Sequence, residues 1–338
     1  KGLHFQVRKL GVDFFPGFAT FIDQSTIEVD GNTLHGETFI VATGSKAKHL
    51  PSLDHSSKHV MTAKDIFNLK KLPKSMTIIG AGAIGVEFAY FFNALGSKIT
   101  LLEAQENILP NEDIEISQWM HKVLKRKKVD IQTNTIATDI NDEYVLVSIG
   151  VEGNSNGFGL NKIGVEIDKN KHIKVDQNGK TNIDNIYAVG DVIGPPWLAH
   201  VSSTEGLYVA EHIAKLNPKQ IDYDCVPACT YSKPEIGSIG LSQKTLDERG
   251  INYKIAKSFF NANGKAVASS STEGFIKILV SNDNHILGAH IIGSNATEMI
   301  SEFSLAMRNN LSVENILDTI HPHPTFSEAI FETLMQLK

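Results

Sequence analysis

The chain has 338 residues, of which 41% are hydrophobic, so it is long enough for two or three globular domains. Its formal net charge of −6 argues against a nucleic acid or an anionic membrane surface as principal partner. No apolar run approaches the ~20 residues of a membrane span, and the first residues lack the apolar core and cleavage site of a signal peptide. We therefore expect a metabolic protein of a reducing compartment, with no nucleic-acid or membrane partner.

The chain begins with three strand-like runs, at 18–22, 26–29 and 38–42. The last run leads into Thr43, Gly44 and Ser45. Free backbone N–H groups and a hydroxyl at the end of a strand suit a cofactor that passes over it, although the same residues are also typical of a plain loop. The polar residues 46–75 are predicted to form an irregular passage into the next domain.

A short apolar run at 77–79 is followed by G-x-G-x-x-G, with Gly80, Gly82 and Gly85, and by a helical pattern. The first glycine permits a tight turn, the second lets backbone N–H groups approach a pyrophosphate, and the third lets the helix pack closely on the strand. Glu103 ends the next strand, where its carboxylate can accept from both ribose hydroxyls and would repel a 2′-phosphate. The stretch predicts NAD rather than NADP; the alternative is a glycine turn that serves packing only.

A helix is predicted at 112–128, and further parallel strands at 129–132 and 144–149, before Gly150. The segment 138–143 between these strands is very short for a full connection. It contains either a tight turn or a site where residues are absent from this sequence.

The run 185–190 is another buried strand and delivers Asp191 at its end. That carboxylate either caps the next turn or faces a ligand at the carboxyl edge of a sheet. A helix is predicted at 199–216. Beyond residue 222 we expect an α+β domain, plausible as an oligomer interface, with strands at 228–231, 236–241, 275–280 and 286–292 and helices at 296–309 and 312–319.

The sequence contains two cysteines, Cys225 and Cys229. Their C-x-x-x-C spacing, interrupted by Pro227, is neither a redox C-x-x-C pair nor a zinc site. We predict that both are buried thiols.

The most distinctive stretch is HPHPTFSE, residues 321–328, in which two prolines give a rigid, extended presentation of two imidazoles. One interpretation is structural, because Thr325 and Glu328 have the spacing of a capping box. A second is a His-x-His metal pair, but the chain shows no obvious further ligands. The functional interpretation makes His323 a general base that Glu328 orients.

These motifs together resemble the dihydrolipoamide dehydrogenase family: GAGAIGVEFA with Glu103, ATGS at 42–45, YAVGD at 187–191, LAH at 198–200, DYDCVP at 222–227, YSKPE at 231–235 and HPHPTFSE. The resemblance spans nearly the whole chain. It implies an α/β fold with Rossmann-like FAD and NAD domains, the FAD domain incomplete, and a C-terminal α+β dimerisation domain. The implied boundaries are 1–72 and 151–221 for the FAD domain, 73–150 for the NAD domain and 222–338 for the dimerisation domain.

The resemblance also implies site residues. NAD would be held by Gly80, Ala81, Gly82, Ala83, Ile84, Gly85, Val86, Glu87, Glu103, Ala137 and Gly150. FAD would contact Thr43, Gly44, Ser45, Asp191, Trp197, Leu198, Ala199 and His200. His323, supported by Glu328, would act as the acid–base residue across a homodimer interface.

The implied activity is oxidation of dihydrolipoamide through an active-site disulfide and FAD, with reduction of NAD⁺. The implied partner is the lipoyl-bearing acyltransferase of a 2-oxoacid dehydrogenase complex, or the glycine cleavage system, in a bacterial cytoplasm or a mitochondrial matrix. The alternatives are a glutathione reductase-like sibling enzyme and a non-catalytic NAD-binding assembly module.

The sequence departs from the family pattern in several places. It contains neither the G-x-G-x-x-G turn for FAD nor the redox-active C-x-x-x-x-C pair, and we expect both in an N-terminal part outside this sequence. Val151 stands where the family usually has Arg, and Lys233 where it has His. The short 138–143 segment takes the place of a β-hairpin.

Overall fold

The computed structural model describes residues 2–137 and 142–338 of the chain. Most of the short 138–143 connection therefore lies outside the described residues, and the prediction made for it stays a prediction. The chain divides into two compact units, Lys1–Lys46 with Val151–Ile221, and Ala47–Gly150 with Asp222–Lys338. The first boundary falls within the predicted 1–72 segment, and the predicted domain limits also stay a prediction.

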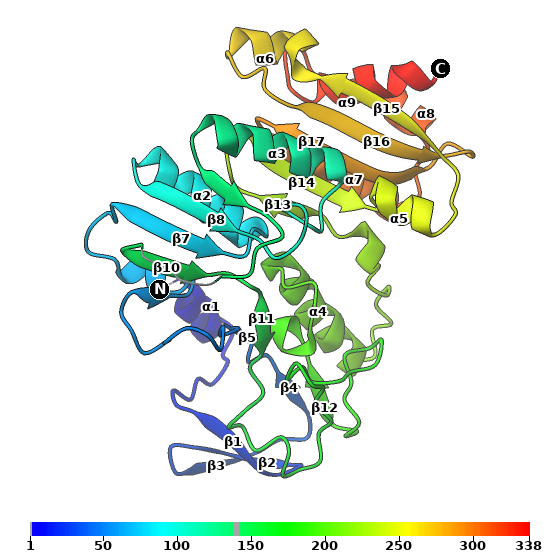
Figure 1. The fold of residues 1–338 in the computed structure, drawn as a ribbon. Coiled ribbons are helices and arrows are strands. Elements are labelled where there is room, and N and C mark those ends of the chain that lie inside the picture. The colour runs from blue at the N-terminus through cyan, green and yellow to red at the C-terminus, as the bar shows by residue number, and fades with distance from the viewer. Residues whose placement is uncertain (1, 138–141) are drawn as a thin grey trace. The chain divides into compact units, whose positions relative to one another are not determined.

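The first unit combines a small antiparallel sheet with a parallel strand pair (Figure 1). In the pair, Ile40 lies opposite Tyr187, so segments almost 150 residues apart become neighbours. Phe21, Val41 and Ile186 belong to the buried core between these layers. The elements are α1 (Gly2–Lys9), β1 (Ala19–Asp23), β2 (Thr26–Val29), β3 (Asn32–His35), β4 (Phe39–Val41), β5 (Ser45–Ala47, reaching the unit boundary), β11 (Val151–Gly153), β12 (Ile186–Ala188), η2 (Gly190–Ile193) and α4 (Ala199–Ile213).

The first part of the second unit is a parallel sheet in the order β6-β10-β7-β8-β9. The predicted parallel strands are thus confirmed, but residues 46–75 are less irregular than expected, because β6 adds a strand to the sheet edge. Two residues are too few to produce a period in the sequence. The elements are β6 (Val60–Met61), η1 (Asp65–Asn68), β7 (Ser75–Ile79), α2 (Ala83–Ala94), β8 (Lys98–Leu102), α3 (Ile114–Arg126), β9 (Asp130–Gln132) and β10 (Tyr144–Val147).

Helix α2 ends in a Schellman motif. Gly96, with φ of +102°, donates its N–H to Asn93 O, and Ser97 donates to Phe92 O. Only a residue that tolerates the left-handed region fits this position without strain. Gly96 is therefore the C′ residue that ends α2, and it sets the direction in which the chain enters β8.

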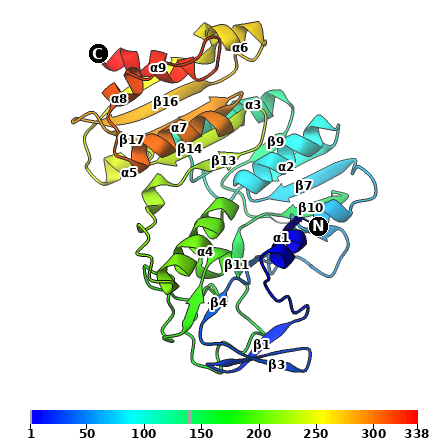
Figure 2. The ribbon, with the colours of Figure 1, turned by 180° about the vertical axis from the view of Figure 1, so that it is seen from behind.

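The second part of this unit is an antiparallel five-stranded sheet in the order β13-β14-β17-β16-β15. Figure 2 shows α7 lying along the face formed by β14 and β17. The elements are η3 (Tyr223–Cys225), β13 (Ala228–Thr230), β14 (Glu235–Gly240), α5 (Gln243–Glu248), β15 (Tyr253–Phe259), η4 (Phe260–Ala262), α6 (Gly264–Ala268), β16 (Phe275–Ser281), β17 (Ile286–Gly293), α7 (Ala296–Arg308), α8 (Val313–Leu317), α9 (Glu328–Leu334) and η5 (Met335–Leu337).

Alternate residues of this sheet enter two different cores. Ile276 and Ile291 pack with Phe303 of α7 and with the last helices, whereas Phe275 and Ile292 join the core of the parallel sheet. The period of two along each strand thus lets one sheet bind helices on both faces.

A buried ion pair ties α3 to β16. The Lys277 side chain is 0% exposed, and its Nζ lies 3.0 Å from both carboxylate oxygens of Asp113 and 2.8 Å from Gln243 Oε1. Asp113 also caps α3 by accepting from the Glu115 N–H. An ammonium buried this completely is tolerated only because several acceptors surround it.

Candidate functional site

The glycine turn after β7 has the geometry that its sequence predicts. Gly80 has φ of +94°, and a Cβ on Gly85 would lie 1.9 Å from Gly80 O, so the two positions set the turn and the packing of α2 on the strand. Gly82 caps α2, and a Cβ there would meet no atom within 4 Å. The protein itself leaves this space open at the start of a helix. Free N–H groups at a helix start are suited to bind a phosphate.

Glu103 is buried at the end of β8 and is tied to the same turn. Its Oε2 accepts from the Ala81 N–H at 2.7 Å and its Oε1 from the Gln105 N–H at 2.9 Å. Nearby, Ala137 packs with Ile79 and Leu102, where β7 and β8 end. The structure therefore brings these predicted nucleotide residues to the carboxyl edge of one parallel sheet.

The other members of the predicted NAD set differ in placement. Val86 is fully buried in the core, so its side chain cannot touch a nucleotide, whereas Ile84 is exposed. Gly150 has φ of +97° just beyond β10. Glu87 points toward β13 and accepts from the Tyr231 N–H at 2.7 Å, and burial raises the pKa of its carboxyl.

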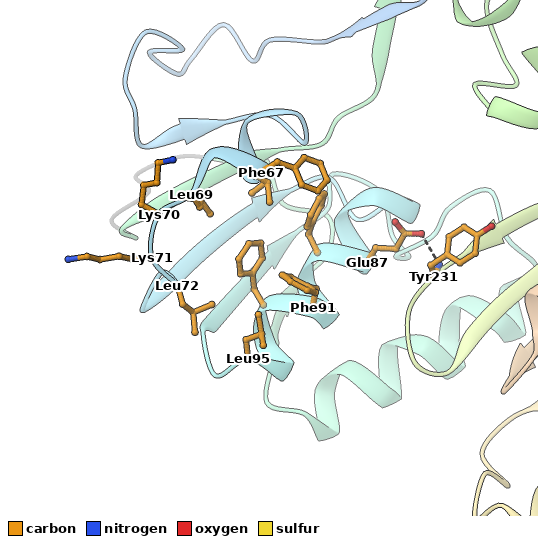
Figure 3. Close-up of a pocket in the computed structure, with 12 residues that line it drawn as sticks. Phe67, Leu69, Lys70, Lys71, Leu72, Glu87, Phe91, Leu95 and Tyr231 are labelled. Atoms are coloured by element: carbon orange, nitrogen blue, oxygen red, sulfur yellow. Dashed lines mark hydrogen bonds between the residues drawn. The ribbon is translucent and has the colours of Figure 1, made fainter. Parts of the chain in front are cut away.

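Glu87 also lines an apolar cavity of about 530 Å³ on the flank of α2 (Figure 3). The segment 66–72 forms the opposite wall, with Phe67 and Leu72 facing Phe91 and Leu95 of the helix. Tyr231 lies at the Glu87 end. None of the glycines of the turn lines this cavity.

In the first unit, the predicted flavin residues converge from distant parts of the chain. Ser45 Oγ donates to Asp191 Oδ2 at 2.7 Å, across 146 positions of sequence. Asn154, which the sequence did not single out, donates its N–H to Gly44 O and its amide to Thr43 O. These bonds fix the loop after β4 against the start of η2.

Two observations test whether this loop fits a flavin cofactor. Thr43 Oγ1 is buried and has no hydrogen-bond partner in the described part of the chain. Gly44 has φ of +71°, and a Cβ there would meet nothing within 4 Å. Trp197 is partly exposed near His172, and Leu198, Ala199 and His200 form the cap and first turn of α4. An unpaired hydroxyl beside open space is what a polar cofactor would satisfy.

His323 and Glu328 form the contact that their spacing predicts. Nδ1 of His323 lies 2.8 Å from Glu328 Oε1, and the imidazole is 77% exposed while the carboxylate is mostly covered. Glu328 Oε2 accepts from the Thr325 N–H at 2.8 Å. That bond, followed by the one from His323, lowers the pKa of the Glu328 carboxyl, so it stays ionised and holds Nδ1 as a donor.

The capping-box interpretation is only half right. Glu328 does accept from the Thr325 backbone, but the Thr325 hydroxyl donates to Pro322 O at 2.8 Å rather than to the helix. Ser327 is the N-cap of α9 and makes no side-chain capping bond. The Thr325 hydroxyl therefore binds the residue before His323 and does not cap the helix. Glu328 accepts hydrogen bonds from the loop backbone and from His323.

His321, the other imidazole of the motif, is turned inward. It is only 7% exposed and contacts Glu302 of α7, a partner that no local pattern indicated. Within residues 2–137 and 142–338, no three His, Cys, Asp or Glu side chains come together as a metal site requires. The structure thus gives the two histidines different surroundings rather than a shared ligand position.

The two cysteines are free, and both are half-buried rather than buried as predicted. Burial and the carboxylate of Asp222, which lies 3.3 Å from Cys225 Sγ, raise the pKa of that thiol to about 11. Burial likewise raises the pKa of Cys229. Both stay protonated at neutral pH and are poor nucleophiles.

Among the described residues, no helix is both long enough and apolar enough to cross a membrane.

Comparison with known proteins identifies the family of the chain. Residues 1–206 match the profile of pyridine nucleotide-disulphide oxidoreductases, and residues 226–334 match the dimerisation domain of the same group. The chain is 37% identical to a dihydrolipoyl dehydrogenase of Bacillus subtilis, covering 99% of this chain and 78% of that protein. It is 35% identical to the dihydrolipoyl dehydrogenase of Zymomonas mobilis, covering 92% and 71%.

Solved structures of two related proteins have the same fold as this chain. The HOCl-induced flavoprotein disulfide reductase RclA of Escherichia coli superposes with a TM-score of 0.90 at 26% identity, over 97% of this chain and 80% of that one. LpdA of Mycobacterium tuberculosis gives a TM-score of 0.93 at 24% identity over 100% and 80%, which supports the fold. The α/β fold with a C-terminal dimerisation domain is confirmed, and the chain belongs to the pyridine nucleotide-disulphide oxidoreductase family.

Proposed function

We propose that this chain carries the NAD and acid–base parts of a dihydrolipoyl dehydrogenase. Relatives named dihydrolipoyl dehydrogenase match most of the chain, at 35–37% identity for the two described above. The observation that carries the proposal is the His323–Glu328 contact at 2.8 Å, in which an exposed imidazole has its Nδ1 held by an ionised carboxylate. Nε2 is then the free basic atom.

The proposed roles follow from this arrangement. Glu328 fixes the tautomer with hydrogen on Nδ1, and His323 takes a thiol proton from dihydrolipoamide at Nε2, as a general base positioned by its neighbour does. FAD, when bound, supplies the two-electron carrier between a redox disulfide and NAD⁺. Thr43, Ser45 and Asp191 would hold FAD, whereas Gly82 and Glu103 would hold NAD.

The proposal extends to assembly. The dimerisation domain supports a homodimer, and we place the action of His323 on the partner subunit of that dimer. The substrate would be the dihydrolipoyl group of an acyltransferase in a 2-oxoacid dehydrogenase complex. A bacterial cytoplasm is the proposed compartment, since both relatives described above come from bacteria.

The test uses a holoenzyme that includes a redox disulfide, which the sequence of this chain lacks. We expect dihydrolipoamide-dependent reduction of NAD⁺, little reduction of NADP⁺, and bleaching of a flavin absorption band by dihydrolipoamide. Preference for NADP⁺ with glutathione disulfide as electron acceptor would favour the sibling reductase. A colourless dimer that binds NADH without turnover would favour an assembly module.

A further inference from the structure

Two histidine–glutamate pairs flank Pro322 and differ in burial. His323 contacts Glu328 at 2.8 Å with its side chain 77% exposed, whereas His321 contacts Glu302 at 2.9 Å with its side chain 7% exposed. The contact with Glu328 selects the tautomer of His323, but it restrains the position of the exposed ring only weakly, since water competes for the imidazole and ordering it costs entropy. The position of His323 therefore depends on what holds the backbone that carries it.

His321 has an oxygen acceptor on each ring nitrogen. Nε2 lies 2.9 Å from Glu302 Oε1, and Nδ1 lies 3.1 Å from Thr319 O. A carbonyl and a carboxylate oxygen only accept, so both contacts are hydrogen bonds only when both nitrogens carry hydrogen. A neutral ring would place a lone pair against one of the two oxygens. The two contacts hold the ring at both nitrogens and so restrain the chain immediately before Pro322.

Glu302 connects the His321 ring to the rigid core. It lies on α7, whose Met299, Ile300 and Phe303 are buried against the five-stranded sheet. Glu302 also lines a cavity of about 470 Å³ together with Pro324 and Thr325, so it lies beside the turn that ends at Glu328. The charge of His321 is among the influences that lower the pKa of Glu328, after the bonds from Thr325 and His323. The two pairs are therefore neighbours in space as well as in sequence.

We infer that Glu302 and His321 are positioning residues for His323: they pin the Pro322 turn to α7, so that Nδ1 of His323 meets Glu328 and Nε2 faces outward. Neither residue needs to touch the substrate. The inference rests on the proposed function for the catalytic role of His323. The positioning of the His323 ring by Glu302 and His321 does not depend on that function.

The geometry is tested on this chain by nitrogen NMR of ¹⁵N-labelled histidine rings, with Glu302→Gln compared with the native sequence. We expect the His323 ring to lose its dominant Nδ1–H tautomer and to show averaged signals. Glu314→Gln is the matched control, since it removes a glutamate of α8 that accepts from Asn284 and contacts neither histidine. An unchanged His323 spectrum in a folded Glu302→Gln protein would overturn the inference, whatever its melting temperature.

His321→Gln is measured in the same way, because Glu302→Gln removes the negative charge beside a buried imidazole and can unfold the loop. Its amide carries both N–H donors on one nitrogen, so it can donate to Glu302 but cannot also span to Thr319 O as the two ring nitrogens do. We expect the same loss of tautomer preference at His323. A native-like His323 ring in this variant also counts against the inference.

Turnover of the holoenzyme separates the two proposals. Glu302→Gln should lower kcat with dihydrolipoamide about tenfold and leave KM for NAD⁺ unchanged, a smaller loss than the roughly 10²- to 10⁴-fold expected on removing a general base. Glu302→Asp should restore part of the rate. Full activity of His323→Gln would refute the catalytic role of His323, whereas an inactive His323→Gln with a normal Glu302→Gln rate would refute only the positioning role.

Discussion

Glu328 binds His323 and the backbone at once, with Oε1 2.8 Å from His323 Nδ1 and Oε2 2.8 Å from the Thr325 nitrogen. The hydrogen bond from the Thr325 backbone fixes the carboxylate, and the fixed carboxylate in turn orients the imidazole. This arrangement explains how an exposed histidine can keep one tautomer.

Replacement of Glu328 by Gln removes the charge while keeping the shape of the side chain. The amide has a single acceptor oxygen, so it can serve His323 or Thr325 but not both. We expect dihydrolipoamide turnover by the holoenzyme to fall by about 10²-fold, at the lower end of the range for general acid–base groups. Steady-state kinetics measures the loss, with the neighbouring Glu332→Gln as control. Equal rates for the two variants would contradict the proposed role of Glu328.

The glycine turn offers a matched pair of variants for the nucleotide site. A Cβ at Gly82 meets no protein atom, so Gly82→Ala should fold normally and yet bind NADH at least tenfold more weakly, because the methyl group occupies the space of the pyrophosphate. Gly85→Ala should instead destabilise the fold, since its Cβ would overlap Gly80 O. Calorimetric titration with NADH and thermal melts distinguish these effects. Native affinity in Gly82→Ala would place the nucleotide elsewhere.

Breaking the buried Lys277–Asp113 pair should destabilise the second unit strongly. Lys277→Met leaves a buried carboxylate without its cation and should lower the free energy of unfolding by about 3–5 kcal/mol. Adding Asp113→Asn should recover part of that loss. Lys244→Met is the control, because its contact with Glu248 is exposed and should be worth at most about 1 kcal/mol. Urea unfolding measures the stability of all three variants. Similar losses for Lys277→Met and Lys244→Met would refute the structural importance of the buried pair.

Glu112 should make stability fall as pH rises. Burial raises the pKa of its carboxyl from 4.5 to about 7. The residue as a whole is half-buried, but Oε2 is inaccessible to solvent and has no hydrogen-bond partner among the described residues. Oε1 accepts from Ser238. Between these two pH values the folded chain holds a proton that the unfolded chain has released, so stability is lost across that window.

The test is Glu112→Gln, which cannot titrate. The stability of the variant relative to the native sequence should increase from pH 4 to pH 8 by roughly 3 kcal/mol at most, from the size of the pKa shift. Chemical unfolding at several pH values measures this difference, with Glu248→Gln on the surface as control. A difference that stays constant with pH would show that Glu112 does not hold the proton.

Elements with one buried face could be predicted from the sequence, and exposed edge elements could not. The parallel strands β7 and β8 have buried apolar residues and were predicted within a residue or two. Strands β3 and β15 were missed because most of their residues are exposed or half-exposed, so no apolar period marks them. Strand β6 was missed because it is only two residues long.

The candidate site divides in the same way. The His323–Glu328 contact spans five positions and could be predicted from local chemistry, whereas His321–Glu302 depends on how α7 packs. The Ser45–Asp191 bond joins the segments that follow β4 and β12, and a sequence alone does not reveal that these strands are neighbours. Resemblance to a family could nominate both residues, but not their mutual hydrogen bond.

The carboxylate of Glu103 already holds the amide of Ala81, so the turn that would receive a dinucleotide is tethered by the protein's own anion. Because the turn is already held in place, the protein loses little conformational entropy when a ligand binds there. Capture of the coenzyme should accordingly proceed in one kinetic phase whose rate scales with concentration, without the plateau that a slow rearrangement imposes.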